Sequence, residues 1–215
     1  MTISQHPTEE TLAAYAAGHL DEGRTVVVAA HVAMCPACRG WVSNLVGAGG
    51  ALLDDLPPAA IAGDALARTI ARLDTAAPAS PVRVKPATPA DLPMLPASAR
   101  PYPVGRWQWL GPGVRWRPIG VPHAHGARVF LLKAQPGTTM PHHTHTGTEL
   151  TLVLTGAFDH ELGHFGPGDI DEADGTIEHQ PVVARGEECV CLVAMEGQLQ
   201  LLGWMGRLMQ PFVRI

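Results

Sequence analysis

A proline- and alanine-rich stretch divides this chain into two halves of different character, and this break most constrains the fold. Residues 76–103 hold many prolines and alanines and have no lasting hydrophobic period. Such a composition predicts a semi-extended linker rather than a packed element. We therefore expect two domains, residues 1–75 and 104–200, followed by a C-terminal tail at residues 201–215.

The half before the linker has helical periodicity, with apolar residues recurring three and four positions apart. The glycines of residues 47–50 and the pair Pro57-Pro58 predict a break before the last helix. A small all-α domain is therefore expected. Its four predicted helical windows are Thr8–Ala17, Arg24–Met34, Ala37–Val46 and Ala59–Leu73.

The half after the linker instead holds short runs of β-forming residues separated by Gly, Pro and Asp. Many short strands with frequent turn signals predict an all-β sandwich or barrel. The clearest predicted strands are Arg128–Ala134, Thr148–Leu154, Val182–Ala184 and Cys189–Met195.

Charge and hydropathy narrow the possible functions. The net charge is −5, which disfavours direct DNA binding. No apolar run reaches the roughly 20 residues that a membrane-spanning helix needs. The N-terminus lacks a basic segment followed by an apolar one, so we expect a cytoplasmic protein.

Histidine and cysteine lie close together in the first half. His31, Cys35 and Cys38 form His-x₃-Cys-x₂-Cys on a predicted helix, where positions four apart share a face. Two thiolates and an imidazole favour Zn²⁺. The fourth ligand is His6 or His19. A redox dithiol is the main rival, but it normally follows a strand, whereas this segment is helical.

This arrangement resembles the zinc-binding anti-sigma domain, in which an upstream histidine precedes His-x₃-Cys-x₂-Cys. The resemblance implies His6, His31, Cys35 and Cys38 as the ligands of one Zn²⁺. It also implies that the fourth helix helps to clasp a sigma factor, through the apolar stripe Leu66, Ile70 and Leu73. Without the resemblance, that stripe would be read as packing on the other helices.

A second group of ligands lies in the β half. Gly137-x₅-His143-x-His145-x₃-Glu149-x₆-Gly156 resembles the first motif of the cupin family, and His179 fits the ligand of its second motif. His143 and His145 point to the same side of a strand, whereas His142 points away. Three imidazoles and a carboxylate suit a divalent transition metal and do not choose between Zn, Mn, Fe and Ni.

The remaining cysteines and histidines have simpler expected roles. Cys189 and Cys191 share one strand face and are expected to be buried, either inside the barrel or against a partner. Five further histidines are expected on the surface or in loops: His19, His123, His125, His160 and His164.

A zinc-binding helical domain followed by a cupin (double-stranded β-helix, jelly-roll) barrel resembles the ChrR-type zinc-binding anti-sigma factors. This resemblance implies a regulator of transcription that is not an enzyme. It would sequester a group IV (extracytoplasmic-function) sigma factor in a one-to-one complex and release it under oxidative stress, in response to singlet oxygen or organic hydroperoxides. The resemblance further implies Zn²⁺ at both sites and a sensory role for the cupin domain.

Two other functions remain open at this point. A cupin with these ligands could be a dioxygenase or isomerase with an accessory helical domain. Alternatively, Cys35 and Cys38 could form a disulfide and expel zinc, which would make the first domain a thiol-redox switch.

Overall fold

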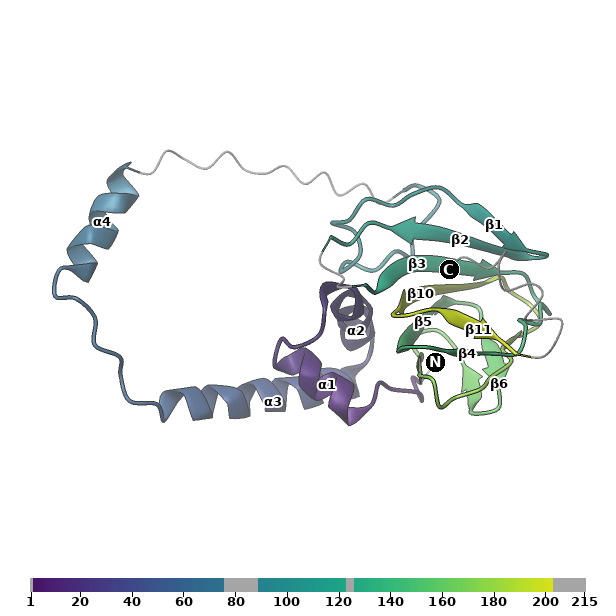
Figure 1. Ribbon diagram of the computed structural model, residues 1–215, viewed down its shortest axis with the longest axis horizontal. Coiled ribbons are helices and arrows are strands. Elements are labelled where there is room, and N and C mark those ends of the chain that lie inside the picture. The colour runs from purple at the N-terminus through teal and green to yellow at the C-terminus, as the bar shows by residue number, and fades with distance from the viewer. Residues whose placement is uncertain (1, 76–88, 123–125, 203–215) are drawn as a thin grey trace.

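The computed structural model describes residues 2–75, 89–122 and 126–202, and the features below concern these residues. The first part is helical and the rest is β-rich (Figure 1). The helices are α1 (Glu9–Ala16), α2 (Glu22–Met34), α3 (Pro36–Asp54) and α4 (Ala65–Thr75). The strands are β1 (Gln108–Gly111), β2 (Val114–Ile119), β3 (Arg128–Ala134), β4 (His143–His145), β5 (Glu149–Thr155), β6 (Phe158–His160), β7 (Gly163–Phe165), β8 (Ile170–Ala173), β9 (Val182–Val183), β10 (Cys189–Met195) and β11 (Leu199–Leu201).

Polar side chains fix where the first helices begin. Thr8 caps α1 by accepting from the backbone N–H of Thr11, and Asp21 caps α2 by accepting from that of Arg24. Cys35 ends α2 and caps α3, and the two helices are bent by 115° there. The bend brings the last turn of α2 next to the first turn of α3.

The third helix is longer than the sequence predicted. We expected Ala37–Val46 with a break at residues 47–50, but α3 runs unbroken to Asp54. Glycine inside a helix costs only about 1 kcal/mol relative to alanine, and the surrounding alanines and leucines favour the helix. The break instead falls in the segment between α3 and α4, which contains Pro57-Pro58.

The β domain consists of a six-stranded antiparallel sheet, ordered β1-β2-β3-β10-β5-β8, with a two-stranded sheet β11-β4 and a three-stranded sheet β7-β6-β9. These sheets do not close into a continuous hydrogen-bonded barrel. Phenylalanines from the large sheet and from the three-stranded sheet meet in one apolar interior, as Phe130, Phe158 and Phe165 illustrate. The four predicted strands correspond to β3, β5, β9 and β10.

Strand β10 is buried on both faces. Cys189, Cys191 and Val193 face the interior of the β domain, whereas Val190 and Leu192 belong to a second core on the outer face of the sheet. A strand covered on both sides reads as a continuous apolar run, which is the pattern of residues 189–195.

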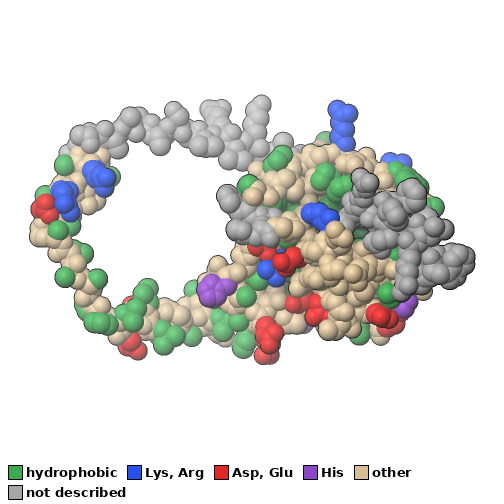
Figure 2. Space-filling model, viewed as in Figure 1, with side chains coloured by type: hydrophobic (Ala, Val, Ile, Leu, Met, Phe, Trp, Pro, Cys, Tyr) green, Lys and Arg blue, Asp and Glu red, His purple; other side chains and the backbone are tan. Residues whose placement is uncertain are grey.

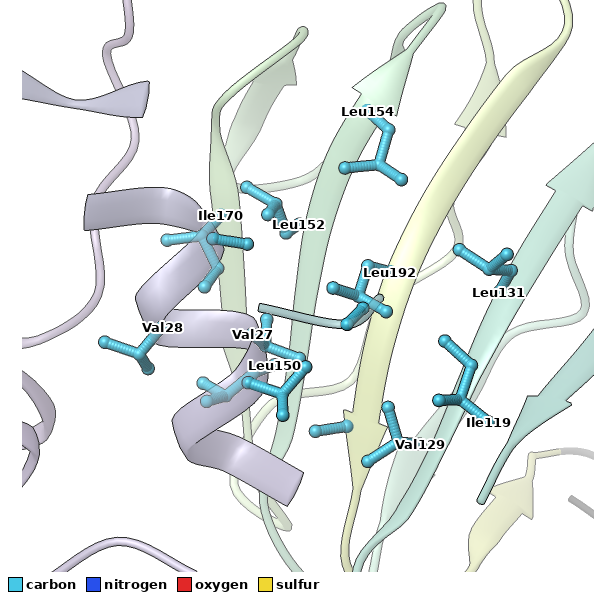
Figure 3. Packing of buried hydrophobic residues seen from close by; sticks show 14 of the residues in the cluster. Val27, Val28, Ile119, Val129, Leu131, Leu150, Leu152, Leu154, Ile170 and Leu192 are labelled. Carbon is cyan, nitrogen blue, oxygen red and sulfur yellow. The ribbon is translucent and has the colours of Figure 1, made fainter. Parts of the chain in front are cut away.

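Helix α2 covers the outer face of the large sheet (Figures 1 and 3). Val27 and Val28 are fully buried and lie in the same core as Leu150, Leu152 and Leu192. The helical part and the β domain therefore share one hydrophobic core.

The second half of the predicted linker also enters this core. Leu92, Leu95 and Ala99 are buried in it, and the Ser98 hydroxyl donates to the carbonyl of Val26 over 2.8 Å. This part of residues 76–103 is therefore packed, which differs from the expected tether, because its leucines find apolar partners on α2 and the sheet. Residues 76–88, most of the predicted tail, and His123 and His125 lie outside the described residues.

Helix α4 and the end of α3 carry apolar side chains that are exposed rather than buried in the shared core (Figure 2). Leu66 and Leu73 are 72% and 73% exposed, and Ile70 is also exposed. The apolar stripe of the fourth helix therefore does not pack on the other helices. Within the described residues no single helix is long and apolar enough to cross a membrane; α2 and α3 reach that threshold only as a bent pair, by length and composition alone.

The shared core predicts a large effect of truncating a sheet residue that lies under α2. Leu152 is 0% exposed in this core. We expect Leu152→Ala to lower the free energy of unfolding by about 3 kcal/mol, because it leaves a cavity between sheet and helix. Denaturant unfolding followed by circular dichroism measures this. Leu162→Ala, at a site that is 57% exposed, should stay within about 0.5 kcal/mol of the parent. Similar losses in both variants would contradict the shared core.

Two candidate metal centres

Four of the predicted ligands meet at the junction of α2 and α3. We call His6, His31, Cys35 and Cys38 the helical cluster. Their ligand atoms all lie within 4.8 Å of one another. His31 Nε2 is 3.2 Å from Cys38 Sγ, and His6 Nδ1 is 3.4 Å from the same sulfur. The structure thus selects His6, and not His19, as the fourth member.

The local fold explains this convergence. His31 lies in the last turn of α2, and the bend at Cys35 returns the chain so that Cys38 faces it. His6 comes from the segment before α1, and its Nδ1 is 3.6 Å from Cys35 Sγ. His31, Cys35 and Cys38 are buried, whereas His6 is exposed at the edge.

Hydrogen bonding and burial set the ionisation of this cluster. His31 Nδ1 lies 2.8 Å from the carbonyl oxygen of Gly168, which can only accept, so Nδ1 carries the proton and Nε2 is free to bind a metal. Burial lowers the pKa of His31, which keeps the imidazole neutral. Burial, and then the neighbouring Cys35, raise the pKa of Cys38 to about 12. A bound cation would be needed to hold this sulfur as a thiolate.

The second group of predicted ligands meets inside the β domain. We call His143, His145 and His179 the cupin cluster. His143 and His145 come from β4, and His179 pairs with His143 through a β-bridge. His179 Nε2 lies 3.0 Å from His143 Nε2 and 3.2 Å from His145 Nε2. His142, which directly precedes β4, is exposed.

Glu149 lies beside this cluster rather than within it. Its Oε2 is 3.7 Å from His145 Nδ1, and its Oε1 accepts a hydrogen bond from the Thr151 hydroxyl over 2.9 Å. Burial raises the pKa of Glu149, and the nearby His143 opposes this shift.

The histidines of the cupin cluster are suited to bind a metal. Burial lowers the pKa of all three, that of His179 to about 4, so each imidazole is neutral near pH 7. His143 donates through Nδ1 to the carbonyl of Pro141 over 2.7 Å, which leaves Nε2 free. His145 Nδ1 and His179 Nδ1 are buried without hydrogen-bond partners among the described residues. The three Nε2 atoms converge on one point, and three neutral imidazoles in this arrangement fit a divalent transition metal.

The sequence analysis did not identify one histidine that lies next to the cupin cluster. His160 was expected on the surface, but its side chain is 0% exposed. Its Nε2 donates to Asp171 Oδ2 over 3.1 Å, and the same oxygen lies 3.7 Å from His179 Nδ1. The alternation of Phe158 and His160 on one strand face was the available signal, but a three-residue strand is too short to establish a period. His19 and His164 are exposed, as expected.

A cavity of about 440 Å³ extends from the cupin cluster into the β domain. Cys189 and Cys191 contribute to its wall, and their sulfurs lie 3.6 Å apart. They therefore lie inside the β domain, one of the two positions expected. The rest of the lining is largely apolar and includes Leu110, Phe130, Leu132, Phe158, Val193 and Met195.

Each half of the chain matches a known protein family. Residues 103–200 match the family described as "ChrR Cupin-like domain". Residues 7–39 match the family described as "Putative zinc-finger". The matches confirm the predicted order of a zinc-binding helical domain followed by a cupin-like domain.

Two similar proteins extend over both domains. The chain is 41% identical over 217 residues to the anti-sigma-E factor ChrR of Cereibacter sphaeroides, and the match covers 100% of each protein. It is also similar to a chain in the crystal structure of Rhodobacter sphaeroides SigE in complex with the anti-sigma ChrR. That match has a TM-score of 0.74 and 37% identity, and covers 91% of this chain and 100% of the other. The protein therefore belongs to the ChrR family of anti-sigma factors.

Proposed function

We propose that this protein binds a group IV sigma factor in a one-to-one complex and withholds it from RNA polymerase. The observation that carries this proposal is the full-length relationship to ChrR, a protein crystallised with SigE. In this role the chain is a regulator and not an enzyme, and transcription is the process that it controls.

The binding surface proposed for the sigma factor is the exposed apolar side of α4 together with the end of α3. Leu66, Ile70 and Leu73 form the stripe on α4, and Leu52 and Leu53 continue the apolar surface on α3. Figure 2 displays hydrophobic side chains gathered over the end of α3 and the segment leading to α4. Apolar patches of this kind are typical of protein–protein contacts, in which a helix fits a groove of the partner.

The helical cluster is proposed to hold a Zn²⁺ ion through His6, His31, Cys35 and Cys38. Two sulfurs and two nitrogens are a common ligand set of structural zinc sites. The ion would join the segment before α1 to the bend between α2 and α3. Because a metal site of this kind rarely exists in the unfolded chain, binding of the ion contributes to folding directly.

A second Zn²⁺ is proposed in the cupin cluster, held by His143, His145 and His179, with Glu149 as the fourth ligand. Glu149 is proposed because it is a largely buried carboxylate that lines the same cavity as His143 and His179, with Oε2 3.7 Å from His145 Nδ1. The choice of zinc over other divalent metals rests on the family resemblance.

The proposed signal for release of the sigma factor is singlet oxygen or an organic hydroperoxide, received by the β domain. The cavity supports this proposal for hydroperoxides, because its largely apolar wall would accept an alkyl chain and its lining also includes histidines and thiols.

The metal assignment predicts the zinc content of variants. Purified wild-type protein should contain about two zinc ions per chain, one for each ligand set. Cys38→Ala should lose about one, because three ligands hold the ion poorly, whereas Cys189→Ala should keep both. Elemental analysis of the full-length proteins measures this. Two zinc ions retained in Cys38→Ala would refute the helical centre.

The proposed binding surface predicts the effect of charges on α4. Leu66→Asp and Leu73→Asp should each weaken binding to the cognate group IV sigma factor by about 30-fold, because each buries a charge against an apolar groove. Isothermal titration calorimetry measures the affinity. Leu162→Asp places the same charge on an exposed leucine of the β domain and should have no effect. Equal affinities of all three variants for the sigma factor would show that the stripe on α4 is not the binding surface.

The cavity predicts a variant that binds the sigma factor but responds poorly. Val193 is buried in the cavity wall, so Val193→Phe should fill part of the space that an alkyl hydroperoxide would occupy. A reporter from a sigma-dependent promoter should stay repressed in unstressed cells and show several-fold weaker induction by an organic hydroperoxide. Leu162→Phe serves as the surface control. Full induction in Val193→Phe would argue against the cavity as the receiving site.

A further inference from the structure

The two clusters are joined by one short segment of the β domain, residues 168–172. The segment comprises the end of the turn between β7 and β8 and the first three residues of β8. Successive side chains of a strand point to opposite faces of a sheet. This segment therefore presents groups to both the helical side and the interior.

On the helical side, the segment holds two members of the helical cluster. The Gly168 carbonyl accepts a hydrogen bond from His31 Nδ1 over 2.8 Å. Asp169 Oδ1 accepts from the backbone N–H groups of Ser4 and Gln5 over 2.7 and 2.9 Å, immediately before His6. The positions of two of the four ligands thus depend on this turn.

The following residues continue the same contacts. Ile170 is buried in the core beside α2 (Figure 3), and its N–H donates to the carbonyl of Gln5 over 3.3 Å. Glu172 accepts hydrogen bonds from the backbone N–H and hydroxyl of Thr8 and from the hydroxyl of Thr11. Glu172 thereby ties the beginning of α1 to β8.

Between these residues, Asp171 points the other way, into the β domain. Its side chain is 5% exposed, and its Oδ2 lies between His160 Nε2 at 3.1 Å and His179 Nδ1 at 3.7 Å. The opposite nitrogen of His179 faces His143 and His145. A carboxylate behind a ligand histidine is the usual outer-shell partner of a protein-bound metal, where it fixes the orientation of the imidazole.

We propose that Asp171, held by His160, is a positioning residue for His179, and that residues 168–172 couple the two clusters, so that filling the cupin cluster with a metal strengthens the hold of the helical cluster on its own ion. The coupling rests on the two metal centres proposed above. A metal that holds His179 would keep its Nδ1, which has no hydrogen-bond partner among the described residues, beside Asp171 Oδ2 at 3.7 Å. With Asp171 restrained, β8 would keep Gly168, Asp169 and Glu172 in register with the helical ligands. Because coupling between two binding sites is reciprocal, each ion stabilises the other.

The test follows cobalt in the helical cluster of the full-length protein. The background carries Cys189→Ala and Cys191→Ala, so that Cys35 and Cys38 are the only thiols of the chain. Cobalt bound to thiolate has a charge-transfer absorption, and its decay in excess chelator reports the loss of metal from this cluster alone.

Two variants probe the coupling from the cupin side. Asp171→Asn removes the carboxylate charge, and His145→Ala removes a ligand. Each should accelerate the decay by about tenfold, within the range usual for coupled sites and outer-shell groups. Asp159→Asn is the matched control, because Asp159 lies on β6 and its exposed carboxylate pairs with the exposed side chain of His164. Its decay should equal that of the parent.

Glu172→Gln tests the connection from the helical side without altering the interior. When Glu172→Gln is already present, adding His145→Ala should accelerate the decay of the cobalt absorption less than it does in the parent. The two changes are then non-additive, as expected if Glu172 is part of the connection between the clusters. Equal decay rates in the parent, Asp171→Asn and His145→Ala, with the absorption present, would overturn the coupling alone. An absence of the absorption in the parent would overturn the proposed helical metal centre, and the coupling with it.

Discussion

The packing of α2 on the outer face of the six-stranded sheet is the contact on which the other features depend. Val27 and His31 are four residues apart, so they share one face of the helix. The face that buries Val27 against Leu150 and Leu192 therefore also turns His31 toward the β domain. There its Nδ1 donates to the Gly168 carbonyl, which leaves Nε2 available for the helical cluster. A hydrophobic contact thus fixes the tautomer of a candidate ligand.

Burial sets the protonation state of the candidate ligands in both clusters. Desolvation keeps His31 and His179 neutral and raises the pKa of Cys38. Without a metal the Cys38 thiol stays protonated at neutral pH, whereas the imidazoles of the cupin cluster are already neutral. Metal binding to the thiol therefore releases a proton, and binding at either cluster adds its free energy to folding. The two clusters are therefore sites where ligand chemistry and fold stability depend on each other.

The sequence predicted those features that depend on local spacing. His143 and His145 could be assigned together because strand parity is local, and Cys35 with Cys38 because a helix turn is local. Local spacing alone left the choice between His6 and His19 open, and only the family resemblance implied His6. The segment that carries His6 is held by Asp169, which is more than 160 residues away in the chain.

The features that the sequence did not reveal depend on tertiary contacts. The continuation of α3 through its glycines and the burial of Leu92 and Leu95 oppose what composition alone favours. Asp171 had no motif to distinguish it, and His160 was assigned to the surface because its strand is only three residues long.

Helix α3 connects the helical cluster to the exposed apolar surface. It begins at the cluster and ends near the exposed residues Leu52 and Leu53. Its 19 residues span roughly 27 Å at 1.5 Å per residue. A rotation of about 10° at the bend near Cys35 therefore displaces its far end by about 5 Å. A shift of that size separates side chains that were in contact, so a change in the geometry of the helical cluster would disturb the apolar surface that we propose for the sigma factor.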